Sequence, residues 1–342
     1  MNIYQLSRGV TEVEVKNFCK AFDVSSPGNC SSLKDLRDHI RTNVLKNESK
    51  VVTIGNFKGG IGKTANAFVI STVGAFLGLR VLVIDMDPQA NISKLLYDPH
   101  KKYIDNLGTI SQFFYEGGKG RLKDIAAQTE EGLDIITGTD LLIEIEQALV
   151  PPMRQDLNNR FSNVGNVREV ISEEEKWLPV ALNDAKKDYD LIIIDTPPAL
   201  GRLIRSVMMG TDHYIFPINT DFISSEAIPQ IMTKFKKAVT ENNREFDLSM
   251  FSILLSDPHQ RADIQDFKDE LVAMEPLLIN EYISRNELLL YKRKRGTIQV
   301  PVWTCDDFSS EDFLALMRLG RKALVKSQVI GISSLQEATA HE

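Results

Sequence analysis

Hydrophobic residues fall into short runs that alternate with longer amphipathic stretches from residue 51 onward. Most short runs are continuous, which is typical of parallel strands covered on both faces. The alternation predicts an α/β fold, a mostly parallel twisted sheet with helices on both faces. The helix after the first strand is expected to run from Lys63 to Leu77, with Gly78 as its C-cap. The predicted strands are Val51–Ile54, Val81–Ile84, Leu133–Ile136, Leu191–Ile194, Tyr214–Pro217, Phe251–Leu255 and Val300–Val302.

The N-terminal region has a different pattern. Helical spacing predicts helices over Val13–Phe22 and Ser32–Val44, on either side of a Ser-Ser-Pro-Gly-Asn turn. Ser31 or Ser32 can cap the second helix, and Asp35 then lies in its first turn. Lys46–Lys50 is predicted to be a polar linker that leads into the first strand of the sheet.

Composition divides the chain into three parts. We predict a small helical extension over residues 1–48, an α/β domain over residues 49–330 and a polar tail over residues 331–342. Within the large domain, Pro151–Trp177 is polar and rich in Asn, Arg and Glu. That segment is predicted to be an insertion or a mobile loop.

Overall composition narrows the class of protein. The 342 residues are 43% hydrophobic and 25% charged, as in ordinary soluble proteins. No apolar stretch reaches the roughly 18–20 residues that cross a bilayer, and the N-terminus lacks the layout of a signal peptide. Cys19, Cys30 and Cys305 are scattered, with no spacing suited to zinc, a metal cluster or a disulfide framework. These features predict a cytoplasmic protein.

The strongest chemical signal is Lys58-Gly59-Gly60-Ile61-Gly62-Lys63-Thr64, shortly after the first predicted strand. Its glycines let a triphosphate lie against bare backbone, where N–H groups can point at phosphate oxygens. Lys63 supplies a positive charge to the β- and γ-phosphates, and the Thr64 hydroxyl can ligate Mg²⁺. An ordinary phosphate loop has glycine at the position of Phe57. Here a second lysine, Lys58, follows instead.

Two acidic stretches follow predicted strands at the same edge of the sheet as this loop. One is Asp85-Met86-Asp87-Pro88-Gln89 and the other is Asp195-Thr196-Pro197-Pro198. A carboxylate in this place can position a water molecule or reach Mg²⁺. Each aspartate can instead be a helix N-cap after a strand, but their occurrence together with the loop favours a nucleotide site.

These three stretches together resemble the ParA/MinD superfamily of deviant-Walker ATPases, and most of all the ParA-type DNA partition proteins. The resemblance covers roughly residues 50–326 and implies a P-loop ATPase domain that binds ATP and Mg²⁺ and hydrolyses ATP. Later segments that also fit are Pro217–Asp221 with Ser225-Glu226-Ala227, and Ile283–Asn286 followed by Gly296 and Val300-Pro301.

The resemblance assigns a role to each matching position. The loop from Lys58 to Ala65 contacts the phosphates. Thr64 ligates Mg²⁺, Asp85 supports the metal site, and Asp195 lies in the outer shell of the metal. The family often has Thr or Ser at the position of Ala65, so a hydroxyl contact to the α-phosphate is lost here while the backbone N–H remains.

The implied catalytic residues are Lys63, Asp87 and Lys58. Lys63 neutralises phosphate charge, and Asp87 positions the attacking water. Lys58 reaches the nucleotide of the other subunit, because the family forms a homodimer in the ATP state.

The resemblance also implies non-specific binding of the ATP-bound dimer to double-stranded DNA, and a ParB-like centromere-binding adaptor that stimulates hydrolysis. The whole chain has a net charge of −7, but residues 291–326 contain eight Lys/Arg against four Asp/Glu. Arg318, Lys322 and Lys326 share one helix face and can displace DNA counterions, although a solvated surface is the alternative. The predicted DNA-binding residues are Lys292, Arg293, Lys294, Arg295, Arg318, Arg321, Lys322 and Lys326.

Three alternatives remain open at this point. The N-terminal helix pair weakly resembles a SAP-type or helix-turn-helix DNA-binding element, and a dimerisation or docking role is equally expected. MinD-like proteins end in a basic amphipathic helix that binds membranes, whereas residues 331–342 are polar, so we expect no membrane binding. A metabolic enzyme of the superfamily is a further alternative. The favoured function is partition of a plasmid or chromosome by a cytoplasmic ATPase that associates with the nucleoid when ATP is bound.

Overall fold

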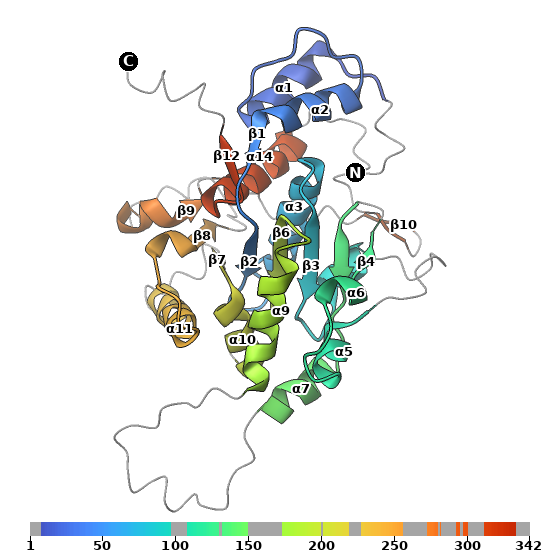
Figure 1. Ribbon diagram of the computed structural model, residues 1–342. Coiled ribbons are helices and arrows are strands. Elements are labelled where there is room, and N and C mark those ends of the chain that lie inside the picture. The colour runs from blue at the N-terminus through green and yellow to red at the C-terminus, as the bar shows by residue number, and fades with distance from the viewer. Residues whose placement is uncertain are drawn as a thin grey trace, which may run out of the picture.

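An eight-stranded sheet forms the centre of the molecule (Figure 1). The computed structural model describes residues 8–96, 108–129, 132–149, 173–199, 201–218, 227–255, 272–279, 281, 292–294, 297–299 and 311–332. The strand order is β4-β5-β3-β6-β2-β7-β8-β9, and every neighbouring pair is parallel except β4 with β5. The strands are β2 Lys50–Ile54, β3 Val81–Asp85, β4 Ala127–Gln128, β5 Asp134–Ile136, β6 Leu191–Asp195, β7 His213–Ile218, β8 Phe251–Leu255 and β9 Leu278–Ile279.

Successive residues of the central strands enter different hydrophobic clusters. Val52 and Ile54 of β2 belong to the cluster that contains α3 (Lys63–Phe76) and α14 (Glu311–Lys326). Val51 belongs to the cluster that contains α9 (Trp177–Ala185) and α10 (Arg202–Gly210). Every residue of β3 and β6 is buried, because helices cover both faces of the sheet.

The structure confirms the predicted fold class and most of the predicted elements. Six of the predicted strands lie within one residue of their expected ends, and α3 ends one residue before the predicted Leu77. Gly78 has φ +80, the left-handed conformation expected after a helix C-terminus. The predicted strand Val300–Val302 lies outside the described residues. The edge strands β4 and β9 were not predicted, since each has only two residues.

The N-terminal region forms the two expected helices, α1 (Glu12–Phe22) and α2 (Leu33–Asn43). Ser32, one of the two predicted caps, caps α2, and Asp35 lies in its first turn as predicted. The two residues form a capping box, and α1 has a similar box of its own. The predicted linker Lys46–Lys50 is wrong at both ends. Lys46 closes the strand β1 (Val44–Lys46), which pairs with β12 (Ile330–Ile332), and Lys50 opens β2. A three-residue strand whose partner lies far away along the chain leaves no local signal.

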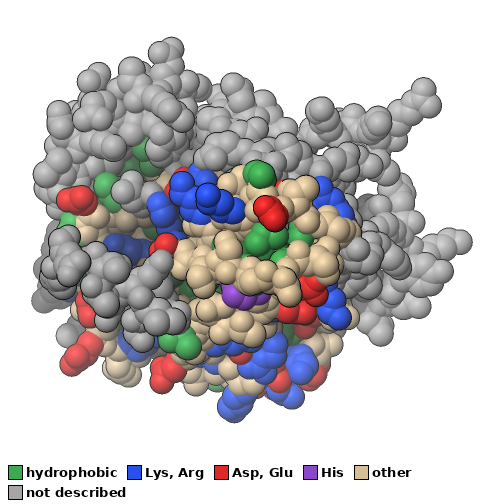
Figure 2. Space-filling view, turned by 90° about the horizontal axis from the view of Figure 1, so that it is seen from above, with side chains coloured by type: hydrophobic (Ala, Val, Ile, Leu, Met, Phe, Trp, Pro, Cys, Tyr) green, Lys and Arg blue, Asp and Glu red, His purple; other side chains and the backbone are tan. Residues whose placement is uncertain are grey.

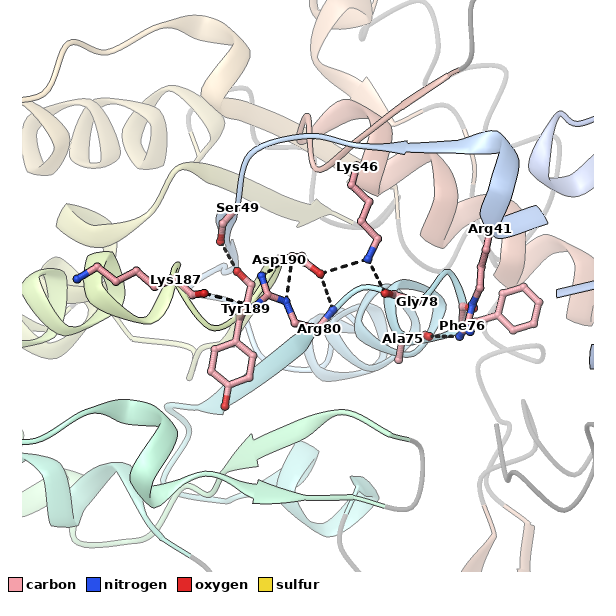
Figure 3. A network of polar contacts seen from close by, with 10 residues as sticks. All are labelled: Arg41, Lys46, Ser49, Ala75, Phe76, Gly78, Arg80, Lys187, Tyr189 and Asp190. Atoms are coloured by element: carbon pink, nitrogen blue, oxygen red, sulfur yellow. Dashed lines mark hydrogen bonds and ion pairs between the residues drawn. The ribbon is translucent and has the colours of Figure 1, made fainter. Parts of the chain in front are cut away.

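Figure 3 shows how the N-terminal region meets the end of α3. Arg41 donates to the carbonyls of Phe76 at 2.8 Å and Ala75 at 3.2 Å, and Lys46 donates to Gly78 at 2.7 Å. The Ala75 carbonyl also accepts from the Gly78 N–H at 3.0 Å. The two cations add hydrogen bonds at this end of α3 and complement the negative end of the helix dipole. The Phe22 ring stacks on Phe76 with centroids 5.5 Å apart. The N-terminal helices are therefore packed against the same helix that begins at the phosphate loop.

The other helices complete the layers around the sheet. None of the described helices is both long and apolar enough to cross a membrane. Most of the predicted insertion Pro151–Trp177 lies outside the described residues. The predicted tail over residues 331–342 begins too early, because Gly331 and Ile332 belong to β12, and its remaining residues lie outside the described part of the chain. The remaining helices are α4 Asn91–Leu96, α5 Ile110–Tyr115, α6 Leu122–Ile125, α7 Leu142–Leu149, α11 Ala227–Glu241 and the 3₁₀ turns Glu174–Lys176, Leu248–Met250 and Val272–Leu277.

Candidate nucleotide site

The loop between β2 and α3 has the geometry of a phosphate cradle. Gly60 and Gly62 have φ +74 and +78, a conformation that other residues adopt only with strain. The Lys63 side chain is 7% exposed in this loop, and its Nζ donates to the Lys58 carbonyl at 2.8 Å. Burial lowers the pKa of the Lys63 ammonium, while the carboxylates of Asp195 and Asp87 oppose that shift. The Lys63 ammonium therefore closes the loop through the Lys58 carbonyl, in a position from which it can bind an anion.

Asn56 braces the entrance of the loop, which sequence reasoning did not identify. Its side-chain amide donates to the Pro217 carbonyl at 2.6 Å, and its side-chain oxygen accepts from the Lys58 N–H at 2.9 Å. Asn56 therefore ties the start of the loop to the end of the neighbouring strand β7. An asparagine between a strand and a glycine loop carries no distinctive signal in one sequence.

Asp85 and Asp195 meet across paired strands at the same edge of the sheet. They are register partners on β3 and β6, and Asp195 also pairs with Ile54 at the end of β2. Burial raises the pKa of Asp195 to about 8, and the nearby Asp85 carboxylate adds to that shift. Burial likewise raises the pKa of Asp85 to about 6, against hydrogen bonds from Ser93 and the Asp87 amide. Two acids this close and this buried favour a cation between or beside them.

Ser93 of α4 orients Asp85 and was not predicted. Its hydroxyl and its N–H donate to Asp85 Oδ2 at 2.6 and 3.0 Å. The Asp87 N–H donates to the other oxygen of Asp85 at 3.0 Å. Asp85 therefore connects the end of β3 with α4 and with the turn that carries Asp87.

Asp87 lies at the start of a tight turn, 8% exposed. Its carboxylate accepts from the Gln89 N–H at 2.8 Å, and its carbonyl accepts from the Ala90 N–H at 2.9 Å. Gly138 packs against this turn so closely that a Cβ there would lie 2.7 Å from the Asp87 carbonyl oxygen. Only glycine at this position, two residues after β5, leaves room for the turn, a feature that the sequence analysis also missed.

A cavity of about 800 Å³ opens between the loop and the Asp87 turn. It brings together the predicted phosphate-contacting residues from Gly59 to Ala65 with Asp87, whereas Lys58, Asp85 and Asp195 do not line it. The lining residues are Gly59, Gly60, Ile61, Gly62, Lys63, Thr64, Ala65, Asp87, Gln89, Asn91, Lys94, Leu95 and Pro198.

The site fits a magnesium ion that takes most of its ligands from water and phosphate and few from the protein. Both Asp195 oxygens are buried without a hydrogen bond of good geometry, although the Thr64 hydroxyl is near enough to lower its pKa somewhat. A metal-bound water would satisfy those oxygens. Among the described residues no group of three or more His, Cys, Asp or Glu is arranged to hold a metal alone. Mg²⁺ suits such a place, because it keeps several waters and takes ligands from phosphates.

We expect the contribution of Asp195 to the free energy of unfolding to fall as pH rises in the nucleotide-free protein. The folded pKa of about 8 lies above the ordinary value of 3.8, so the folded state keeps a proton that the unfolded state has released. Between these values each pH unit lowers the free energy of unfolding by up to about 1.4 kcal/mol. Asp195→Asn should remove this dependence. The check is chemical unfolding of both proteins at pH 5 and pH 8 without nucleotide or Mg²⁺; parallel changes in both would contradict the assignment.

The predicted DNA-binding cations of α14 are engaged in ion pairs, except Lys326, which forms a hydrogen bond to a backbone carbonyl. Arg318 Nε and Lys322 Nζ lie 3.4 and 2.9 Å from the two carboxylate oxygens of Glu281. Arg321 pairs with Asp23 at 2.8 Å, which joins α14 to the end of α1. Lys326 donates to the Pro276 carbonyl. Arg318 and Lys322 thus share one carboxylate, which reduces the net positive charge of this face.

Three of the other four predicted cations belong to a short strand and not to α14. Lys292–Lys294 form β10, which pairs with β11 (Thr297–Gln299), while Arg295 lies outside the described residues. Figure 1 shows β10 away from α14, on the side of the molecule where β4 lies.

Figure 2 looks onto the end of the molecule where α1 and α2 lie. Among the described residues on this face, basic and acidic side chains alternate and do not form one continuous basic patch (Figure 2). Arg37 of α2 forms an ion pair with Asp38 at 3.1 Å. The DNA-binding interpretation of the N-terminal helices stays a prediction.

Comparisons with known proteins agree with this geometry. The sequence model of a family described as "AAA domain" matches residues 49–248. The sporulation initiation inhibitor protein Soj of Bacillus subtilis is 30% identical over 210 residues, which are 60% of this chain and 72% of Soj. The chromosome partitioning protein ParA of Caulobacter vibrioides is 27% identical over 241 residues, covering 70% of this chain and 82% of that protein. A plasmid partition protein of Borrelia burgdorferi, solved with AMPPNP, has the same fold with a TM-score of 0.59 at 19% identity, over 82% of this chain and all of that one.

Proposed function

Because the chain belongs to the ParA/MinD superfamily of ATPases, we propose that it binds ATP with Mg²⁺, hydrolyses it, and uses the cycle to partition DNA. In this proposal ATP closes two subunits into a homodimer that binds double-stranded DNA without sequence preference. A centromere-binding adaptor then stimulates hydrolysis and releases the dimer. Nucleotide state therefore shifts a monomer–dimer equilibrium that DNA and the adaptor sense.

One arrangement carries the proposal. The phosphate loop, the Asp87 turn and Asp195 follow three adjacent parallel strands, β2, β3 and β6, and gather at one edge of the sheet beside the cavity. Ligands of open parallel sheets bind at the carboxyl ends of the strands. The loop supplies backbone N–H groups and Lys63 for phosphates, and the acids lie where a metal-bound water is needed.

The mechanism follows from what these residues hold. Lys63 leaves the Lys58 carbonyl for the β- and γ-phosphates, because a charge-assisted bond to phosphate is the stronger one. Thr64 and Asp195 would hold Mg²⁺, Asp195 through a metal-bound water, and the ion would shield the phosphate charge. Asp87, fixed by the Gln89 N–H and by contact with Gly138, orients the attacking water in line with the γ-phosphate.

A DNA-binding assay under four conditions tests the proposal: no nucleotide, ADP, ATP and a slowly hydrolysed ATP analogue. We expect retention of random-sequence DNA only with ATP or the analogue, and release as ATP is consumed. Equal DNA binding in all four conditions would contradict nucleotide control. ATP-dependent flotation with liposomes would favour a membrane-positioning ATPase instead.

The basic face of α14 provides a second test. Changing Arg318, Lys322 and Lys326 together to alanine should weaken binding to every DNA sequence similarly. Loss of three phosphate contacts should also reduce the slope of log affinity against log salt by roughly 2.7. Binding of the ATP-loaded protein to a random duplex, measured across a salt series, checks both effects.

Glu281→Ala is the matched control for this triple change. It breaks the same ion pairs with Arg318 and Lys322 but leaves the cations in place. If the cations contact DNA, Glu281→Ala keeps or strengthens binding. If the triple variant acts only by loosening α14, Glu281→Ala weakens DNA binding as well, and the assigned face is wrong.

A further inference from the structure

Lys94 is an exposed lysine that lines the nucleotide cavity and has no part in the mechanism above. It lies on α4, the short helix that follows the Asp87 turn. Its Nζ donates to the carbonyl of Gln89 at 2.6 Å. Lys94 therefore connects the wall of the cavity with the turn that is proposed to position the attacking water.

The peptide groups of Gln89 are held from both sides. The N–H of Gln89 donates to the Asp87 carboxylate at 2.8 Å, and its carbonyl accepts from Lys94. The next residue, Ala90, has φ +50. A left-handed conformation costs a residue with a Cβ roughly 1–2 kcal/mol, so this turn needs its polar contacts to persist. Without the Lys94 side-chain contact, the turn keeps its hydrogen bonds to Asp87 and the bond from the Lys94 N–H to the Ala90 carbonyl at 3.1 Å.

We propose that Lys94 senses the γ-phosphate, by exchanging the Gln89 carbonyl for a terminal phosphate oxygen when a nucleoside triphosphate fills the cavity. The proposal rests on the proposed function, since it takes the cavity to be the ATP site. A charge-assisted hydrogen bond to phosphate is roughly twice as strong as one to a neutral group, which favours the exchange. The flexible stem of lysine and the exposure of Lys94 allow the movement.

ADP and ATP then leave the Asp87 turn in different states. ADP has no terminal phosphate, so Lys94 stays on Gln89 and the turn remains fixed. With ATP the Gln89 carbonyl is released, and the turn can adjust Asp87 to the water or to a stimulating partner. Lys94 acts here as a positioning residue for Asp87 and as a contact for the γ-phosphate.

Nucleotide affinities measured by calorimetry test this sensor. The proteins are the wild type, Lys94→Ala, Lys94→Arg and Lys119→Ala, the last a change at an exposed lysine that does not line the cavity. Lys94→Ala should weaken binding of a slowly hydrolysed ATP analogue by roughly 10-fold or more, as expected for a hydrogen bond to a charged group. ADP affinity should change by less than about twofold, which is within the ordinary effect of a surface substitution. Lys94→Arg and Lys119→Ala should keep the wild-type preference for the analogue.

Hydrogen exchange of the amides at residues 89–91 gives a second measurement. In the wild type the analogue should speed exchange relative to ADP, whereas in Lys94→Ala exchange should be fast with either nucleotide. If Lys94→Ala keeps the wild-type ratio of analogue affinity to ADP affinity, the sensor role of Lys94 is overturned while the proposed function stands. A wild-type protein that binds neither nucleotide would overturn the proposed function, and the sensor with it.

Discussion

Asp87→Ala is expected to slow ATP hydrolysis by roughly 10²–10⁴-fold, the usual effect of losing a group that handles the reacting water. Phosphoryl transfer depends mainly on positioning and charge, so an attacking water that is out of line reacts slowly even when ATP is bound. The loop and Lys63 are unchanged in this variant, and nucleotide binding should persist. The result is an ATP-bound dimer that accumulates on DNA. Phosphate release and sedimentation in the presence of ATP measure the two parts of this prediction.

Asp87→Asn separates the charge of Asp87 from its structural contact. The carboxylate accepts a hydrogen bond from the Gln89 N–H, and an asparagine oxygen can accept the same bond. If the negative charge positions the water, both variants hydrolyse slowly. If only Asp87→Ala is slow, the residue acts by holding the turn. Normal hydrolysis in Asp87→Ala would transfer the role to Asp85 or to another residue.

The nucleotide site was predictable from sequence to the extent that its chemistry is local. The phosphate loop is seven consecutive residues, so the glycines, Lys63 and Thr64 can be recognised together without knowledge of the fold. Asp85 and Asp195 were predicted as site residues because each directly follows an apolar run, and Asp87 because it comes two residues after Asp85. The parallel sheet then places those runs side by side, which is why residues 110 positions apart become neighbours.

The residues that brace the loop and the Asp87 turn were not predicted, because their partners are distant along the chain and no sequence pattern marks them. Gly138 matters only through its contact with the Asp87 turn, and Asn56 only through the carbonyl of Pro217. One glycine or one asparagine has no recognisable spacing. The burial of Asp195 also could not be predicted from the sequence. No local pattern indicates that its side chain lies fully buried beside a second acid.

The basic stripe of α14 shows the opposite problem. Its spacing at Arg318, Lys322 and Lys326 is real, and these residues do lie on one helix. Sequence spacing says nothing of the acidic partner, and Glu281 comes from a segment 37 residues earlier that two of these cations share. Helical periodicity therefore identifies a face, while the charge that this face presents depends on tertiary contacts.

Lys63→Ala and Lys58→Ala are expected to fail at different steps of the cycle. Lys63 is buried in the loop, where its ammonium donates to the Lys58 carbonyl and faces the place of the phosphates. Its loss removes the charge that neutralises the β- and γ-phosphates, so Lys63→Ala should lose measurable ATP binding. Calorimetry with ATP and Mg²⁺ checks this, and full affinity in Lys63→Ala would contradict the assignment of the loop.

Lys58→Ala keeps the group that closes the loop, because the Lys63 ammonium is held by the backbone carbonyl of residue 58 and not by its side chain. The monomer should therefore still bind ATP. Lys58 stands at the start of the loop and is absent from the lining of its own cavity, whereas Lys63 lines it. Across a two-fold axis the Lys58 side chain can reach the partner's phosphates and stabilise the charge that develops there.

Hydrolysis in Lys58→Ala should fall by roughly 10²–10³-fold, as when one electrostatic donor to a transition state is removed, and ATP-dependent dimerisation should be lost with it. Mixing provides the sharpest test of action between subunits. A Lys58→Ala subunit retains an intact nucleotide site, and a Lys63→Ala subunit retains Lys58, so an equimolar mixture can form one complete active site. Recovery of hydrolysis in the mixture, above the sum of the two proteins alone, is the expected result. A Lys58→Ala protein that dimerises and hydrolyses ATP at the wild-type rate would rule out the role across the interface.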